Sequence, residues 1–376
     1  MLTTAIFPSR YVQGDGALSA IGEELARFGE RAFAVMDPFA MASLRDEIEA
    51  GIGTKVRLSA ERFAGECSDE EIGRLADEAQ AVSPDVIVGI GGGKTLDTAK
   101  AVAHVLKLPV AIVPTIASTD APCSALSVIY TPDGTFKRYL VLPRNPDLVL
   151  VDTGVIARAP VRFLVAGMGD ALSTWFEAED CRVKRGANMT GRLGPMTAYA
   201  LARLCYDTLL KYGVLARAAC ARKVVTPALE HVVEANTLLS GLGFESGGLS
   251  AAHAIHNGLT VLHETHAFWH GEKVAIGTLA LLMLADRPPA LIDEVFGFCE
   301  SVGLPTTLAQ IGLGEIDETA LVRVAERACA EGETIWNMPH EVSPRRVVAA
   351  LRAMDEEGRR RAKASAQPAA LPAAAE

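Results

Sequence analysis

The run Asp85-Val-Ile-Val-Gly89 leads directly into Ile90-Gly-Gly-Gly-Lys-Thr95. A short apolar run is typical of a buried parallel strand, and the residues after the glycines predict a helix from about Lys94 to Leu106. Glycines between a strand and a helix let the backbone approach a diphosphate, which free N–H groups at the helix N-terminus can bind. The segment therefore predicts a nucleotide-binding turn, with a purely structural tight turn as the alternative.

The glycine cluster matches two familiar phosphate-binding templates only in part. A P-loop requires glycine where Val88 stands, and the GxGxxG fingerprint of dinucleotide-binding folds requires glycine where Lys94 stands. The placement of the glycines after a strand in an alternating series therefore carries the functional interpretation.

Strand-like and helix-like patterns alternate on both sides of this turn. This alternation predicts a parallel sheet covered by helices on both faces. Short β runs between Ser127 and Val151, around Pro132-Asp-Gly134, predict a hairpin. The other predicted elements are strands at Arg31–Met36, Lys55–Leu58 and Pro109–Val113 and a charged helix over Ser68–Val82.

Asp37 directly follows the strand predicted at Arg31–Met36. A carboxylate at such a strand end can accept hydrogen bonds from an adenosine ribose and would repel a 2′-phosphate, so the residue favours NAD over NADP. The alternative is that Asp37 and Pro38 simply begin a helix.

Strand signals fade after about Ala159, and helical periodicity dominates segments such as Gly191–Lys211 and Ala218–Ser240. The expected organisation is an α/β N-terminal domain over residues 1–159 and an all-α C-terminal domain over residues 160–362. Residues 363–376 are rich in Ala and Pro and are expected to form a disordered tail.

Composition excludes several classes of protein. The chain has 376 residues, with 36 Lys and Arg against 46 Asp and Glu, which gives a net charge of −10. This balance argues against a nucleic-acid or anionic-membrane surface. No signal peptide is recognisable, and no apolar run reaches the roughly 18 residues of a membrane span. The seven scattered cysteines are expected to be free thiols, which together with the missing signal peptide favours the cytoplasm.

Histidines are concentrated in one segment of the second half. Five of the 8 histidines lie between His253 and His270. His253 and His256 share one helical face at i, i+3, and imidazole suits both zinc and iron. A catalytic zinc usually takes three protein ligands, and the carboxylate of Asp170, in an apolar and glycine-flanked helix start, is a candidate for the third. The alternatives are ordinary surface or core histidines and an aspartate that only caps a helix.

Six motifs stand out along the chain, namely Gly91-Gly-Gly-Lys-Thr-Leu-Asp97, Pro114-Thr-Ile-Ala-Ser-Thr-Asp-Ala-Pro122, Gly167-Met-Gly-Asp170, Gly243-Phe-Glu-Ser246, Ala251-Ala-His-Ala-Ile-His-Asn257 and His270-Gly-Glu-Lys273. Together they resemble the glycerol dehydrogenases, metal-dependent members of the iron-containing alcohol dehydrogenase superfamily. The resemblance covers about residues 5 to 355. It implies a dehydroquinate synthase-like architecture with the active site in a cleft between the two domains. It also implies NAD, one zinc ion per subunit in preference to iron, a homo-octamer, and oxidation of glycerol and related small vicinal diols to ketones such as dihydroxyacetone, with hydride transfer to nicotinamide C4.

The same resemblance assigns roles to individual residues. Asp170, His253 and His270 match the metal ligands, and Asp120 matches the residue that holds the substrate hydroxyls. All four are therefore the expected catalytic residues, whereas His256 and His266 are near the site without a ligand role. The residues in segments that hold NAD are Asp37, Gly92, Gly93, Lys94, Asp97, Thr115, Ser118, Ser124, Leu126 and Tyr130.

One departure bears on the metal. Similar iron-dependent alcohol dehydrogenases carry a further histidine four residues after the metal aspartate, and here that position is Thr174. The remaining set of one aspartate and two histidines favours zinc.

Other functions remain as alternatives at this point. On the same fold they are a glycerol-1-phosphate dehydrogenase and a dehydroquinate synthase-like cyclase, which should place several basic side chains near the metal. From other classes they are a nucleotidase or switch built on Gly93-Lys-Thr95 and an assembly protein without chemistry.

Overall fold

The computed structural model describes residues 2–366 of the chain. Its N-terminal part is built on a six-stranded sheet in which every neighbouring pair is parallel, in the order β1-β8-β5-β4-β2-β3. The predicted parallel sheet is therefore confirmed. The strands are β1 (Tyr11–Gly14), β2 (Arg31–Met36), β3 (Arg57–Arg62), β4 (Val86–Gly91), β5 (Val110–Pro114) and β8 (Leu148–Asp152).

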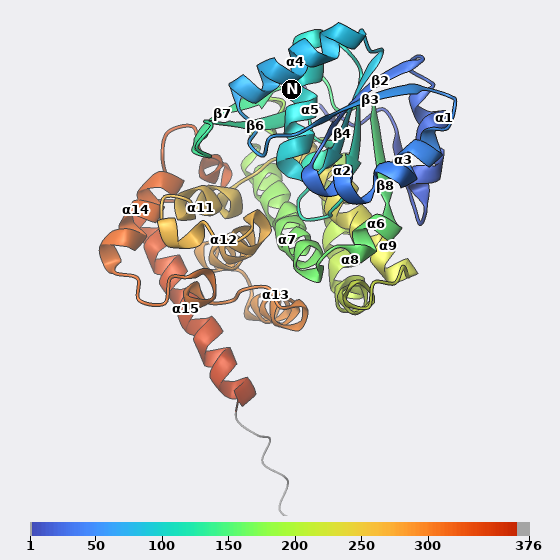
Figure 1. The fold of residues 1–376 in the computed structure, drawn as a ribbon. Coiled ribbons are helices and arrows are strands. Elements are labelled where there is room, and N and C mark those ends of the chain that lie inside the picture. The colour runs from blue at the N-terminus through green and yellow to red at the C-terminus, as the bar shows by residue number, and fades with distance from the viewer. Residues whose placement is uncertain (1, 367–376) are drawn as a thin grey trace, which may run out of the picture.

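Alternate residues of each central strand enter two different hydrophobic cores. Phe33, Val35 and Ile87 pack into a core that continues through helices of the C-terminal half, whereas Val86 and Val88 face a second, smaller core. Because strand side chains alternate between faces, this double burial explains why the strands read as continuous apolar runs. Figure 1 shows α4 and α5 on one side of the sheet and α1 and α3 on the other.

The helices of the sheet half connect successive parallel strands. Ser68 caps α4 by accepting a hydrogen bond from the backbone N–H of Glu71, as expected for a serine before an acidic first turn. The elements are η1 (Ala17–Ala20), α1 (Ile21–Leu25), α2 (Pro38–Ser43), α3 (Arg45–Ile52), α4 (Asp69–Val82) and α5 (Gly93–Leu106).

The hairpin forms as predicted from β6 (Leu126–Tyr130) and β7 (Phe136–Val141), which pair antiparallel. Three strand assignments differ from the sequence prediction. β8 is not part of the hairpin region but inserts between β1 and β5 of the parallel sheet. The edge strand β1 was not predicted because its residues are only half-buried and lack alternation. β3 begins at Arg57 rather than Lys55, and its polar sequence reflects its place at the other edge.

The chain after β8 is helical, and α7 is buried along most of its length against α8 and α12. The predicted helical segment Ala218–Ser240 is interrupted where α8 ends, because Pro227 starts a new helix capped by Thr226. The elements are α6 (Thr153–Arg158), α7 (Val161–Lys184), α8 (Met196–Ala221), α9 (Pro227–Glu234), α10 (Ser240–Gly247), α11 (Ala251–Leu259), α12 (His270–Leu284), α13 (Pro289–Val302), α14 (Glu318–Ala328) and α15 (Pro344–Ala366), with short turns η2 (Ala121–Cys123), η3 (Ala235–Leu239), η4 (His263–Thr265), η5 (Leu308–Ile311) and η6 (Thr334–Asn337).

Two further sequence predictions concern the chain ends and the thiols. Residues 363–366, assigned to the tail, are the last residues of α15, and residues 367–376 lie outside the described part of the chain. All seven cysteines are free, and six of them are buried. Among the described residues, no helix is both long enough and apolar enough to cross a bilayer.

Candidate metal and cofactor site

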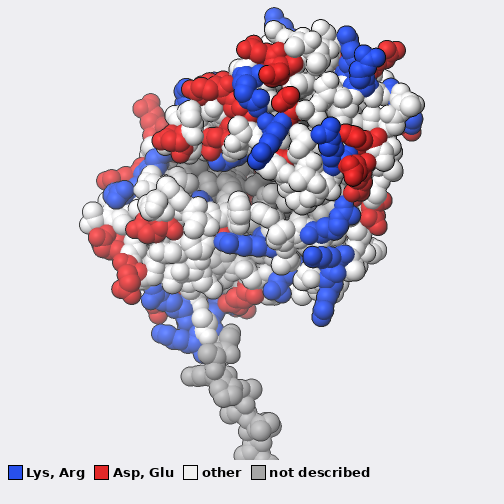
Figure 2. Space-filling view, in the orientation of Figure 1, with Lys and Arg blue, Asp and Glu red and all other residues white. Residues whose placement is uncertain are grey.

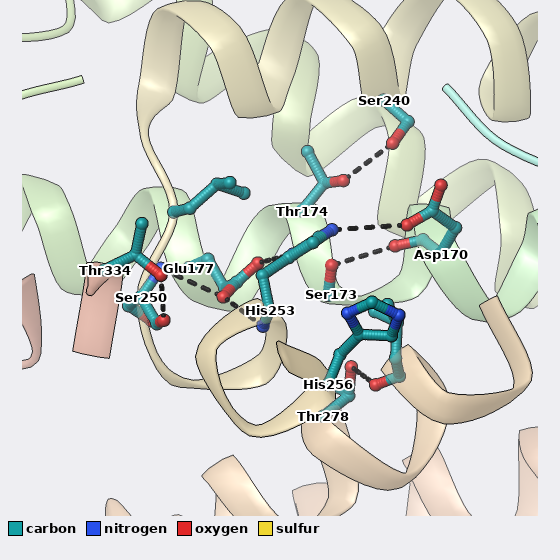
Figure 3. Close-up of polar contacts among 12 residues, drawn as sticks. Asp170, Ser173, Thr174, Glu177, Ser240, Ser250, His253, His256, Thr278 and Thr334 are labelled. Atoms are coloured by element: carbon teal, nitrogen blue, oxygen red, sulfur yellow. Dashed lines mark hydrogen bonds and ion pairs between the residues drawn. The ribbon is translucent and has the colours of Figure 1, made fainter. Parts of the chain in front are cut away.

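Asp170, His253 and His270 come together from three different helices. Asp170 lies on α7, His253 near the start of α11, and His270 is the first residue of α12. His270 Nε2 lies 3.1 Å and His253 Nε2 3.4 Å from Asp170 Oδ1. One ligand atom from each residue lies within 4.8 Å of the other two, and no other such group was found among the described residues. Figure 3 shows His253 pointing toward Asp170.

The close crossing of α7 and α12 requires glycine. A Cβ atom on Gly271 would lie 1.7 Å from the carbonyl oxygen of Ala166, and one on Gly169 would lie 2.4 Å from the carbonyl oxygen of Gly271. No side chain fits at either position, so the two backbones meet directly. This contact places His270, the neighbour of Gly271, against Asp170.

The charges of the cluster suit a cation. Burial would raise the pKa of Asp170, but the two histidines outweigh it and hold the pKa of this carboxyl well below its usual range. Burial would likewise lower the pKa of His253, but Glu177 and Asp170 outweigh it and raise it well above the ordinary value. An ionised carboxylate thus faces two imidazole nitrogens, and these are donors that zinc and iron both accept.

Asp120 borders the cluster from the sheet half. It precedes the short turn η2, and its backbone N–H donates to Asp170 Oδ2 at 3.2 Å. Ser240 Oγ donates to Asp120 Oδ2 at 2.7 Å, and Thr174 Oγ1 lies 2.8 Å from Ser240 Oγ. Burial, and then the charge of Asp170, raise the pKa of Asp120 well above its ordinary value. Thr174 therefore belongs to a hydrogen-bonded chain that ends at Asp120.

The remaining histidines of the segment separate into near and distant ones. His256 Nε2 lies 3.0 Å from His270 Nδ1, so His256 contacts the ring nitrogen of His270 that does not face Asp170. The ring of His266 instead lies 3.0 Å from the carbonyl oxygen of Thr260 and does not reach the cluster. Neither residue was assigned as a ligand, but His266 was expected near the site and instead lies away from the cluster.

The glycine turn lies at the carboxyl ends of neighbouring parallel strands. Gly92 is the N-cap of the 14-residue helix α5, and a Cβ atom on Gly93 would meet nothing within 4 Å. Asp37 Oδ2 accepts from the backbone N–H of Gly92 at 3.2 Å, while its Oδ1 accepts from that of Ala40 at 2.7 Å. Asp37 therefore caps α2 and also contacts the glycine turn, so its two sequence interpretations do not exclude each other.

The other residues predicted to hold NAD lie around this turn. Thr115 donates its backbone N–H to the carbonyl oxygen of Gly91, and Ser118 follows four residues after the end of β5. Lys94 forms an ion pair with Glu66 and lies over the ring of Tyr130, which ends β6.

Two more of these predicted residues, both buried, also have partners within the chain. Asp97 is buried, accepts from the backbone N–H of Val128 and pairs with the buried Lys100. Ser124, also buried, donates to the carbonyl oxygen of Ala121, while Leu126 begins β6 and is partly exposed. The hydrogen bond from Val128 to Asp97 fastens the hairpin to α5, and the part that each residue takes in cofactor binding stays a prediction.

The molecular surface is hollowed between the sheet half and the helical half, as the centre of Figure 2 shows. Both acidic and basic side chains lie on the face drawn there, around the hollow. This arrangement fits a site for a small molecule better than one for nucleic acid.

Two groups at the site were missed by sequence reasoning. Glu177, buried on α7, lies against His253, and Ser240, at the start of α10, lies against Asp120. The spacing of Asp170 and Glu177 at i, i+7 on one helix was a usable signal for the first. Ser240 follows the π-helical turn Ala235–Leu239, and single π turns are frequent at functional sites but leave no clear sequence pattern.

Comparisons with known proteins agree with these observations. The profile of the iron-containing alcohol dehydrogenase family matches residues 8–153. A glycerol dehydrogenase of Thermotoga maritima is 66% identical over 96% of this chain and 99% of its own length, and one of Citrobacter freundii is 52% identical over 94% and 98%. The crystal structure of glycerol dehydrogenase from Schizosaccharomyces pombe superposes with a TM-score of 0.92 at 39% identity, covering 98% of this chain and 94% of that one.

Proposed function

Because this chain belongs to the glycerol dehydrogenases of the iron-containing alcohol dehydrogenase family, we propose that it oxidises glycerol and related small vicinal diols to hydroxyketones with NAD. The observation that carries the proposal is the convergence of Asp170, His253 and His270, whose ligand atoms lie within 4.8 Å of one another. These residues come from positions up to 100 apart in the chain. Such a constellation on three helices is the expected framework of a metal centre that also leaves room for a substrate.

The donor set supports a divalent metal, and zinc in preference to iron. Two imidazole nitrogens and one carboxylate oxygen are a usual protein set for a catalytic zinc, which keeps a further position open. Thr174 is hydrogen-bonded to Ser240 and does not add a fourth ligand. A metal held here would act as a Lewis acid that lowers the pKa of a substrate hydroxyl, and NAD would supply the hydride acceptor.

The chain itself positions the polyol. Asp120 would accept a hydrogen bond from a second hydroxyl of the diol, and Ser240 holds its carboxyl in place through Oδ2. The hydrogen bond from the backbone N–H of Asp120 to the side chain of Asp170 links this substrate contact to the proposed metal ligands. It therefore holds the two groups in a fixed position relative to each other. A buried, hydrogen-bonded carboxyl group discriminates strongly against substrates that lack the matching hydroxyl.

The alternatives with phosphorylated substrates are less well supported. They need cations near the metal ligands, but Arg162 is paired with Glu272, and Lys273 donates to the carbonyl oxygen of Thr265. Assays of glycerol, glycerol-1-phosphate and 1,2-propanediol side by side separate the two classes. Turnover of only the phosphorylated compound would reject the proposed substrate.

The central test is removal of single ligands. We expect Asp170→Asn and His253→Ala to lose the bound metal and to lower kcat/KM by more than the roughly 10–100-fold seen when a hydrogen-bond partner of a ligand is lost. Metal content by elemental analysis and steady-state rates with glycerol and NAD give the readout. His266→Ala is the matched control, because this histidine lies in the same segment but points to Thr260. Wild-type activity in either ligand variant after chelation would contradict the metal assignment.

The assembly and location of the enzyme are proposed from the same family membership. We expect a homo-oligomer, an octamer by resemblance, in the cytoplasm. Light scattering coupled to size-exclusion chromatography measures the subunit number directly.

A further inference from the structure

A buried carboxylate lies behind the ring of His253. Glu177 follows Asp170 by two turns of α7, and its side chain has no solvent exposure (0%). Its Oε2 lies 2.6 Å from His253 Nδ1, while Nε2 of the same ring lies 3.4 Å from Asp170 Oδ1. Figure 3 shows the imidazole between the two acids. One histidine thus joins two carboxylates of a single helix.

The second oxygen of Glu177 is also committed. Oε1 accepts hydrogen bonds from the backbone N–H groups of Ser250, at 2.9 Å, and His253, at 3.0 Å. These residues stand at the start of α11, where the first N–H groups lack partners within the helix. The carboxylate therefore has one oxygen for the ring and one for the backbone that carries the ring.

We propose that Glu177 is a positioning residue of the metal centre. By accepting the Nδ1 proton of His253, it requires Nε2 of the neutral imidazole to be unprotonated, and it holds that nitrogen toward Asp170. A carboxylate behind a ligating histidine fixes its tautomer and its orientation. The inference rests on the proposed function, because it assigns a task to Glu177 only where His253 is a ligand.

The substitution Glu177→Gln tests this division of labour. Glutamine has one oxygen and one NH₂ group, so it cannot accept from the ring and from the backbone together. If its oxygen keeps the two backbone N–H groups, its NH₂ group faces Nδ1 and selects the tautomer with a proton on Nε2. We expect the affinity for zinc, measured by chelator competition on the holoenzyme, to fall by roughly 10–100-fold.

Ser250→Ala is the matched control for a purely structural role. It removes the bond from Ser250 Oγ to Asp180 at the same helix start but leaves Glu177 and His253 in contact. We expect this variant to keep zinc affinity within about threefold of the wild type, well short of the loss in Glu177→Gln. Unchanged zinc affinity in Glu177→Gln, or an equal loss in Ser250→Ala, would overturn the inference. Failure of the wild type to bind zinc, or undiminished binding by Asp170→Asn, would instead reject the proposed function.

A spectroscopic readout on the wild type keeps the test decisive if Glu177→Gln does not fold. With ¹⁵N-labelled histidine, the zinc-loaded protein should show His253 with a proton on Nδ1 and none on Nε2, assigned by comparison with His253→Ala. A His253 ring without a proton on Nδ1 would refute the assigned role.

Discussion

Asp37 illustrates how one side chain can serve the fold and the proposed cofactor site together. Its Oδ1 caps α2 and its Oδ2 accepts from the backbone of Gly92. The sequence allowed two interpretations of Asp37, and the structure confirms the one in which it caps α2. The preference for NAD over NADP stays a prediction, which rests on repulsion between this carboxylate and a 2′-phosphate.

We expect Asp37→Ser to relax the choice of cofactor without unfolding α2. Serine is a good N-cap, so the helix start is retained while the negative charge is lost. The ratio of kcat/KM with NADP to that with NAD should rise by roughly tenfold, equivalent to about 1.4 kcal/mol of removed repulsion. Asp37→Ala, which removes the cap too, should also lower the melting temperature. An unchanged ratio in both variants would separate Asp37 from cofactor selection.

At the scale of elements, the sequence was most informative where burial was complete. The strands β2, β4 and β5 could be predicted from their continuous apolar sequences, because both faces of the sheet are covered there. β8 is equally buried, but its place between β1 and β5 depends on where the chain returns after the hairpin, which no local pattern records. β1 is half-buried at an edge and therefore leaves too weak a pattern.

The crossing of α7 and α12 gives the prediction that belongs to this scale. Gly271→Ala would place a methyl group against the carbonyl oxygen of Ala166. We therefore expect the free energy of unfolding to fall by about 1–3 kcal/mol. We also expect weaker metal binding, because the neighbouring His270 must move. Gly297→Ala on α13 is the control, since its added methyl group meets nothing within 4 Å and alanine favours a helix by up to about 1 kcal/mol. Denaturant unfolding and zinc titration of both variants provide the measurements. Equal stabilities would mean that the helices can separate at no cost.

For the whole molecule, the decisive question was which distant residues meet. Histidine density singled out the segment around His253, but spacing alone did not choose His253 and His270 over His256 and His266. Asp170 lies 83 residues before the nearer histidine, and its apolar, glycine-flanked position made it only a candidate ligand until the resemblance to a family assigned it. Glu177 was not predicted because it contacts Nδ1 of His253, the ring nitrogen that faces away from Asp170. This contact forms only when α7 and α11 pack together.

The two halves also divide the proposed work, and this division is testable. The residues assigned to NAD lie before position 131, and the assigned metal ligands lie after position 169. A hydrogen bond from the backbone N–H of Asp120 to Asp170 joins the two halves at this point. We therefore expect Asp170→Asn to lose turnover yet to bind NADH within about threefold of the wild type, by fluorescence titration, because its charge is not among the phosphate-binding groups.

Gly93→Asp is the reciprocal variant. Its side chain enters open space at the start of α5, where an acidic group favours the helix but repels a diphosphate. It should weaken NADH binding by at least about tenfold and leave the metal content unchanged. Equal losses of NADH affinity in Gly93→Asp and Asp170→Asn would show that the cofactor and metal sites are not separable, contrary to their placement on different halves of the chain.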